Sequence, residues 1–295
     1  MSKDCSRLVL IKGRTRDDVY VGELSENGAS LGSPKRLTFS DSLDFADAWA
    51  RDGKTILFES DRAGRFQIFK QQLGSETAQI LAPGPDDEHG ATLSPDGAWI
   101  LYWTTANGES PAASKRLMRL AASGGPPEQI LETSIESSVD CARSSGSFCI
   151  LSRPEQDYLV FYELDPPRGF GKEIARTPRP MGSSEWSISP DATRLAVAVS
   201  NGLHVVNLRD KTEHDIPFPG RVLSLSWASD GKGLFAAVQS LDYRILRIEL
   251  DGKRRTLLNT GRNQWLGAIN PSPDGRNLAF SQQTFYSNSW LLENF

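Results

Sequence analysis

The sequence predicts an all-β fold, a β-propeller built from repeated strand units, on three observations. A strand, a tight turn and a second strand recur along the whole chain, the copies follow one another at roughly 40 to 50 residues, and the strand segments alternate apolar and polar residues with a period of two. In the clearest copy, residues 91–102, the turn is Ser94-Pro95-Asp96-Gly97. Pro95 presets the φ of a turn, Gly97 tolerates a positive φ, and Asp96 can accept hydrogen bonds from the turn amides.

The turn aspartates mark the repeat, and we expect them to stabilise their turns and to do no chemistry. Five copies keep the aspartate, and these anchors are Asp52, Asp96, Asp191, Asp230 and Asp274. Two weaker copies, around Asp4 and Ser145, have lost part of the motif but keep the apolar strand that follows it. Together the copies make seven repeat units.

The strands of each unit are assigned in chain order, with four strands in each of the central units. The first and last units have three strands each, at residues 7–12, 18–24 and 34–38 and at residues 267–270, 278–281 and 289–292. This predicts a seven-bladed propeller with incomplete first and last blades, in a chain that is a segment of a longer protein or leaves a gap in its closing blades. The alternative is a six-bladed ring, in which residues 7–38 join the strand at 267–270 and residues 278–292 have no place.

The turns resemble the S-P-D-G repeats of TolB-type, WD-like propellers. The best matches are residues 94–97 and 272–275, and the resemblance covers nearly the whole chain. It implies a noncatalytic module that binds a protein, a peptide or a small ligand, as TolB-like rings act as periplasmic interaction platforms. Residues 288–295 also resemble the end of the C-terminal propellers of bacterial transmembrane regulators. That resemblance implies a periplasmic location if the chain is part of such a regulator, and a cytoplasmic one otherwise.

Length and charge agree with one domain over residues 1–295. An uninterrupted repeat in 295 residues favours a single closed ring over two domains. A formal net charge of -4 offers no basic field for phosphates, so we expect no nucleic-acid partner for this segment. No apolar run approaches the roughly 18 residues of a membrane helix, and residues 1–7 lack the apolar segment of a signal peptide.

Catalytic motifs are absent from the sequence, which predicts a protein that is not an enzyme and uses no cofactor. It contains no G-x-S-x-G nucleophile elbow, no Walker A motif and no strand-bound G-x-G-x-x-G. His89, His204 and His214 are the three histidines, and a channel-mouth enzyme such as a metal-dependent polysaccharide lyase is the alternative function. The repeat phase places His204 and His214 toward the rim, away from His89, so we expect no shared metal site.

The loops that lead into the inner strands are the predicted binding surface. In a ring of blades these loops converge around one axis, so residues from different repeats come within reach of one ligand. Two of these loops are acidic and suit a cation or a basic peptide; solvated surface loops are the competing interpretation. The predicted channel-face residues are Asp44, Asp47, Asp87, His89, Glu185, Arg221 and Asn263.

Two further residue types have structural interpretations. Trp49 and Trp227 occupy the same repeat position, which predicts a role in the core between blades. Cys141 and Cys149 flank the weak fourth turn on neighbouring strands, so a disulfide is geometrically conceivable. Two reduced cysteines that pack as small apolar residues are the favoured interpretation of this pair.

Overall fold

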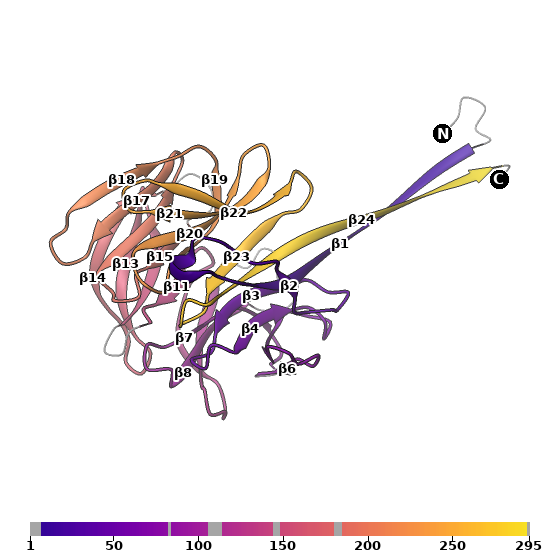
Figure 1. Cartoon of the computed structure of the whole chain (residues 1–295). Helices are drawn as coiled ribbons and strands as arrows, with labels where there is room; N and C mark the ends of the chain where they lie inside the picture. Colours follow the sequence, from indigo (N-terminus) through magenta and orange to yellow (C-terminus); the bar gives the residue numbers. More distant parts are fainter. Residues whose placement is uncertain (1–6, 82–83, 106–113, 144–147, 180–184, 294–295) are drawn as a thin grey trace.

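The computed structural model describes residues 7–81, 84–105, 114–143, 148–179 and 185–293 of the chain. These residues form six antiparallel sheets of four strands each, arranged as the blades of a propeller (Figure 1). The all-β propeller predicted from the repeats is therefore confirmed. Among the described residues, no helix is long and apolar enough to cross a membrane.

Five of the sheets take their strands in chain order, from the innermost to the outermost. The first comprises β3 (Asp44–Trp49), β4 (Thr55–Ser60), β5 (Gln67–Gln72) and β6 (Gln79–Ile80). The next comprises β7 (Asp87–Leu93), β8 (Trp99–Thr105), β9 (Ser114–Ala121) and β10 (Glu128–Ser134). The third comprises β11 (Ser138–Cys141), β12 (Cys149–Glu155), β13 (Tyr158–Asp165) and β14 (Gly169–Pro178).

The remaining two of these five sheets repeat the same order. One comprises β15 (Trp186–Ile188), β16 (Arg194–Val199), β17 (Gly202–Asn207) and β18 (Glu213–Pro217). The other comprises β19 (Arg221–Trp227), β20 (Gly233–Gln239), β21 (Tyr243–Glu249) and β22 (Arg254–Gly261). Each of these strands was expected, because the turn motif fixes where the first strand of a unit ends and the second begins.

The sixth sheet joins the two ends of the chain, in the order β2, β1, β24 and β23. Its strands are β1 (Arg7–Glu23), β2 (Lys35–Arg36), β23 (Leu266–Pro271) and β24 (Asn277–Glu293), and a short 3-10 helix (Glu26–Gly28) follows β1. The register of β1 on β24 is unbroken from Arg7 opposite Glu293 to Glu23 opposite Asn277. This pairing closes the ring, because each half of the sheet satisfies the strand edge of the other.

The number of sheets differs from the preferred count of seven blades and agrees with the six-bladed alternative. The weak first unit and the last unit are two halves of one sheet. Residues 278–292, which lacked a place in the six-bladed arrangement, lie in β24 and pair with β1. The strands expected separately at 7–12 and 18–24 are one continuous strand, as are those expected at 278–281 and 289–292. The repeat spacing does not reveal which units share a sheet.

The apolar core lies between the sheets. Six clusters of buried side chains occur in the described residues, and each draws its members from two sheets that are neighbours in the ring. Trp49 and Trp227, both almost fully buried, belong to two of these clusters, as expected from their repeat position. Their indole nitrogens donate to the carbonyls of Asn270 and Ser187 in the preceding sheet, at 2.8 and 3.0 Å. Each tryptophan therefore fixes two adjacent blades by packing and by one hydrogen bond.

One part of the molecule leaves the ring. Residues 7–16 of β1 and residues 284–293 of β24 pair with each other as a two-stranded ribbon that projects from the propeller (Figure 1). We call residues 7–16 and 284–293 the arm. Both ends of the described chain lie at its tip.

Candidate functional site

The central channel contains a cavity of about 370 Å³ lined by residues from all six sheets. Its charged lining residues are Asp47, Arg51, Asp140, Arg143 and Glu185. The cavity extends from the middle of the inner strands to the turns that follow them, where Pro95 and Pro273 contribute to the wall. It therefore lies deeper in the ring than the loops from which a binding surface was predicted.

Irregular pairing of the inner strands shapes this lining. The register of β3 on β4 shifts between Ala46 and Ala48, so that Asp47 has no partner in the ladder. Similar shifts occur in β7, β19 and β23. A β-bulge bends a strand and redirects the side chain of the extra residue. At β3 the redirected side chain is the carboxylate of Asp47, which lines the cavity.

Asp47 has a buried carboxylate oxygen without a hydrogen-bond partner in the described part of the chain. Its Oδ2 is inaccessible to solvent and has no hydrogen-bond partner among the described residues. Burial raises the pKa of Asp47 well above its usual range, the nearby carboxylate of Glu59 raises it further, and a hydrogen bond from the Ala91 amide opposes the shift. The ionised form of an acid in this situation is stabilised by a positive charge that enters the cavity.

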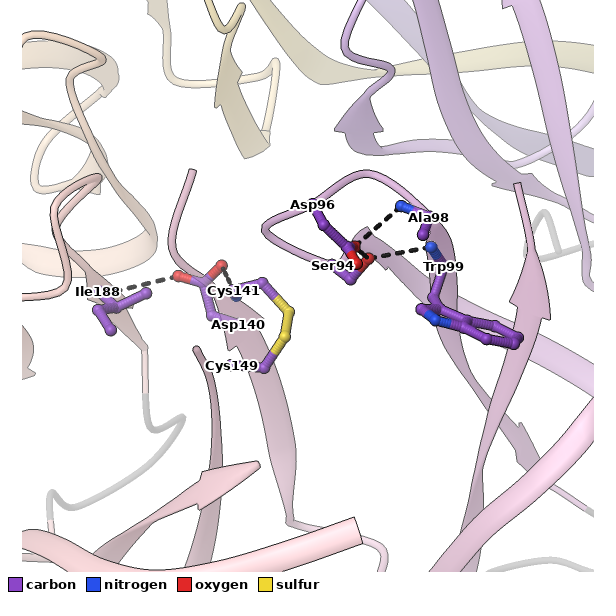
Figure 2. Close-up of a disulfide and its surroundings, with 8 residues drawn as sticks. All are labelled: Ser94, Asp96, Ala98, Trp99, Asp140, Cys141, Cys149 and Ile188. Atoms are coloured by element: carbon purple, nitrogen blue, oxygen red, sulfur yellow. Dashed lines mark hydrogen bonds between the residues drawn. A yellow bond between two sulfur atoms is a disulfide. The ribbon is translucent and has the colours of Figure 1, made fainter. Parts of the chain in front are cut away.

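Asp140 is by contrast held by its neighbours. It accepts hydrogen bonds from the Cys141 amide at 2.8 Å, the Ser187 hydroxyl at 3.0 Å and the Ile188 amide at 3.1 Å, as Figure 2 shows in part. Burial raises the pKa of Asp140, and the guanidinium of Arg143 is the strongest opposing influence. Because most of its acceptor capacity is used inside the protein, Asp140 contributes charge to the channel more than it contributes a free acceptor.

Glu185 completes the acidic lining. Burial raises the pKa of Glu185 to about 7, although the charge of Arg221 lowers it in part. Among the described residues no side chain donates a hydrogen bond to Glu185, whereas Arg143 donates to the hydroxyls of Ser226 and Ser229, each at 3.2 Å. The cavity thus combines one engaged carboxylate with two that have unused acceptors.

Aromatic side chains lie at the end of the channel where the inner strands begin. The ring of Phe45 lies 6.2 Å from that of Trp265 and 6.3 Å from that of Phe66, and Phe66 in turn lies 5.1 Å from the ring of His89. The four rings span three neighbouring sheets and are all partly exposed. We call them the aromatic row; it offers flat apolar surface and π faces beside the acidic channel.

The structure separates the predicted channel-face residues. Asp47 and Glu185 line the cavity, and Arg221 acts on Glu185 by its charge. Asp44 is fully buried and pairs with Arg62 at 3.0 Å, and Asp87 accepts a hydrogen bond from the Phe66 amide at 3.1 Å.

The last two of the seven lie outside the cavity as well. His89 belongs to the aromatic row, with its Nδ1 3.3 Å from Glu59, and Asn263 is an exposed loop residue. The acidic segments expected to form one surface are therefore divided between structural pairs and the channel. The division follows from the side of its strand on which each residue lies.

The anchor aspartates accept hydrogen bonds from their own turns. The Ala98 amide donates to Asp96 Oδ1 at 2.9 Å, the Ser94 hydroxyl donates to the same oxygen, and the Trp99 amide donates to Ser94 Oγ at 2.9 Å (Figure 2). The same arrangement recurs in the turns of Asp191 and Asp274. Asp52 accepts from the amides of residues 54 and 55, and Asp230 from that of residue 232.

The three histidines lie in different environments. His204 on β17 has its Nδ1 2.8 Å from Asp215 and its Nε2 3.5 Å from Glu213, while His214 lies on the neighbouring outer strand β18. Among the residues that the structure describes, no three or more His, Cys, Asp or Glu side chains are grouped as metal ligands would be.

Cys141 and Cys149 form a disulfide, which corrects the expectation that they are reduced (Figure 2). The register of β11 on β12 places the two residues directly opposite one another. The bond joins the inner strand β11, which carries Asp140, to β12.

Sequence reasoning missed Asp140 and Arg143. Asp140 precedes Ser145 by five residues, as Asp47 precedes the anchor Asp52 by five, so the repeat phase marks both positions as equivalent. The missing anchor at Ser145 hid that equivalence. Nothing in the sequence around Arg143 distinguishes it from other surface arginines.

Comparison with known proteins supports the fold. No protein-family model matches the chain. An uncharacterized protein of Agrobacterium fabrum is 24% identical over 136 residues, which span 46% of this chain and 41% of the relative. A TolB structure from Agrobacterium tumefaciens superimposes with a TM-score of 0.70 at 15% identity, over 91% of this chain and 98% of that one.

Two further structures are also similar. TolB from Acinetobacter baumannii gives a TM-score of 0.64 at 17% identity, over 83% of this chain and 64% of that one. A weaker match, with a TM-score of 0.53 at 18% identity over 90% of this chain and 78% of the other, is an oligogalacturonate lyase in complex with manganese. At these identities the likeness concerns the fold, which binding proteins and enzymes share.

Proposed function

We propose that this TolB-type propeller is a noncatalytic binding module, and that it takes a positively charged group of a protein or peptide partner into its central channel. The observation that carries the proposal is the unpaired, solvent-inaccessible Oδ2 of Asp47, which lines a cavity that also contains Asp140 and Glu185. A lysine side chain in the cavity supplies a positive charge, which would stabilise the ionised form of Asp47.

The aromatic row supports a peptide more than an isolated cation. Phe45, Phe66 and Trp265 present partly exposed rings where the inner strands begin. Apolar side chains of a peptide can pack on these rings, and a cation can lie against their faces before it enters the channel. Binding energy would then come from the row, and selectivity for a basic residue from the channel.

A binding role also agrees with the chemistry of the acids. A hydrolytic or eliminating enzyme requires an acid and a base placed on either side of a reacting bond, with a group that stabilises the charge formed. Here Asp140 is fixed by three donors within the protein, and Arg143 is directed to the hydroxyls of β19 and its turn. The lyase alternative has no comparable support, because the two histidines that lie beside carboxylates are in different sheets. His89 lies beside Glu59, and His204 lies beside Glu213 and Asp215.

The proposal is tested with a fluorescein-labelled tetralysine peptide as the probe and a tetraglutamate peptide of the same design as the comparison. We expect fluorescence anisotropy to detect binding of tetralysine and no binding of tetraglutamate. Asp47→Asn keeps the shape of the side chain and removes its charge, so it should weaken the Kd by about tenfold, the effect of about 1.4 kcal/mol.

Glu76→Gln is the matched control, because Glu76 is an exposed acid outside the channel. It should leave the affinity for tetralysine within about twofold of the original. Equal affinity for the two peptides, or an Asp47→Asn variant that binds tetralysine as well as Glu76→Gln does, would show that the channel acids do not form the site.

A further inference from the structure

Most of the large apolar side chains exposed on the described surface lie in the arm. Val9, Ile11, Phe285 and Leu291 are 57%, 71%, 60% and 56% exposed. These four lie on one face of the ribbon, and Leu10 and Trp290, which are paired and each 46% exposed, lie on the other, so both faces carry apolar residues. A two-stranded ribbon with such faces is marginally stable alone in water, and a third strand or another layer stabilises it.

The two edges of the arm differ in charge. The β1 strand of the arm carries Arg14 and Arg16, and charged residues on an edge strand oppose pairing with another strand. Residues 284–292 of β24 contain no charged residue, no proline and no glycine, and they include Phe285, Tyr286 and Trp290. No described strand pairs with β24 on its outer side beyond residue 283. The β24 edge is therefore the one that accepts a further strand.

The large rings do not cover this edge, because they lean toward β1. The Phe285 ring lies over Gly13, where a Cβ atom would come within 2.5 Å of the ring. Arg16 donates to the Tyr286 hydroxyl at 2.7 Å and lies over the same ring at 5.1 Å. Both contacts hold aromatic side chains on the β1 side of the ribbon and leave the backbone of β24 accessible.

The hydrogen-bonding direction of the edge is fixed by the last bond to β23. The Gln283 amide donates to the Trp265 carbonyl at 3.0 Å, on the outer side of β24. Because successive residues of a strand direct their backbone groups to opposite sides, residues 285, 287, 289 and 291 direct theirs to the open edge. An antiparallel partner must place hydrogen-bonding residues opposite these positions.

We propose that the open edge of β24 pairs with the same edge of a second copy of the chain, around a twofold axis at Asn288. In this register Phe285 lies opposite Leu291 of the second copy, and Ser287 lies opposite Ser289. On the other face Tyr286 lies opposite Trp290. The result is a continuous four-stranded sheet between two propellers, with each contact made twice.

The register follows from the direction of the edge and from its composition. Only registers that pair odd-numbered residues with odd-numbered residues satisfy the outward amides of both copies. Among these, the one centred on Asn288 uses the whole free edge from 284 to 292 and places aromatic or aliphatic residues opposite one another. A second copy satisfies the backbone groups of the edge, whereas lipid cannot.

The test uses charges at the two serines that face each other across the axis. At about 10 µM the unmodified protein should sediment as a dimer, with a Kd of that order or lower. The variant Ser287→Lys/Ser289→Lys places lysines opposite lysines, and Ser287→Glu/Ser289→Glu places glutamates opposite glutamates, so each should dimerise at least about tenfold more weakly. An equimolar mixture of the two variants pairs opposite charges and should recover the dimer.

A cross-link tests the axis itself. In a Cys5→Ser background, Asn288→Cys should form a covalent dimer on mild oxidation, because directly opposite residues of antiparallel strands lie within disulfide range. Ile11→Cys is the control, since this exposed position lies on β1, which in the proposed dimer is separated from the β1 of the other copy by both β24 strands. After the same oxidation, the Ile11→Cys variant should run as a monomer on nonreducing gels.

Several results would overturn the proposal. A protein that sediments as a monomer at 10 µM and does not cross-link through residue 288 lacks this interface. A monomer that binds vesicles of anionic phospholipid through the arm would identify lipid as the occupant instead. Failure of the equimolar mixture to recover the dimer, or equal cross-linking at residues 11 and 288, would show association without the twofold register.

Discussion

Replacement of Glu185 by glutamine should stabilise the protein at alkaline pH and leave it unchanged at acid pH. The pKa of this carboxyl is raised from 4.5 to about 7 in the folded protein, with burial as the main cause. The folded state therefore binds the proton more tightly than the unfolded state does. The stabilisation from this protonation is fully present below pH 4.5 and is lost as the pH rises through 7.

The magnitude follows from the size of the shift. At about 1.4 kcal/mol per pH unit, the change from 4.5 to about 7 corresponds to about 3 kcal/mol. Glu185 lines a channel open to solvent, so screening reduces the expected value to about 1 to 2 kcal/mol. Glutamine keeps the shape of the side chain and cannot ionise, so the Glu185→Gln variant should gain about that much free energy of unfolding at pH 8 relative to pH 5.

Urea unfolding of the two proteins at pH 5 and pH 8 measures this difference, which should appear as a shift of the midpoint without a change of slope. Glu76→Gln, an exposed change, is the control and should behave as the unmodified protein at both pH values. An equal pH dependence in the unmodified protein and in Glu185→Gln would refute the argument that burial of this acid opposes its ionisation.

Three further predictions concern the turns, the disulfide and the closing sheet. Asp96→Ala removes the acceptor for the Ala98 amide and the Ser94 hydroxyl, so the free energy of unfolding should fall by about 1 to 2 kcal/mol; a thermal midpoint equal to that of the unmodified protein would contradict the structural role. The variant Cys141→Ala/Cys149→Ala loses the disulfide, so its free energy of unfolding in urea should fall by about 2 kcal/mol. An unchanged free energy of unfolding would mean that the bond does not stabilise the strands it joins. Hydrogen exchange should show residues 17–23 and 277–282 protected like the other sheets, because β1 and β24 pair there between β2 and β23; rapid exchange at these residues would mean that the ring is open at this sheet.

Repeat spacing predicted the units and their turns, because the turn motif depends on local chemistry. The hydroxyl, carboxylate and positive φ that it requires lie within six residues of one another, as in Ser94, Asp96 and Gly97. The closing sheet could not be predicted in the same way. It joins residues such as Tyr20 and Phe280, which are distant in sequence and carry no motif that marks them as partners. The arm was missed for the same reason.

The channel was predicted in part, and the side of the strand on which each acid lies explains the difference. Asp44 and Asp47 belong to one acidic segment, yet Asp44 pairs with Arg62 while Asp47 enters the cavity. Asp44 and Asp47 are three residues apart and so lie on opposite sides of β3, and the register shift between Ala46 and Ala48 leaves Asp47 without a partner in the ladder. Charge alone therefore identified the correct segment but not which of its acids lines the channel.

Hydrogen bonds of the inner strands separate the acids that join neighbouring sheets from the acids that keep an oxygen available for a ligand. Inner-strand amides bond to side chains of the preceding sheet, as the Ala46 amide does to Ser281 Oγ at 2.8 Å and the Gly90 amide to Glu59 Oε2 at 2.9 Å. Asp140 takes the same part for Ile188, whereas Asp47 retains an oxygen without a partner. Removal of the charge should therefore have opposite effects at the two kinds of site. Loss of Asp96 or Asp140 removes hydrogen bonds and destabilises the ring. Loss of the charge at Asp47 or Glu185 relieves the cost of burying that charge, so it stabilises the ring while it weakens binding. This is the behaviour of residues retained for a ligand.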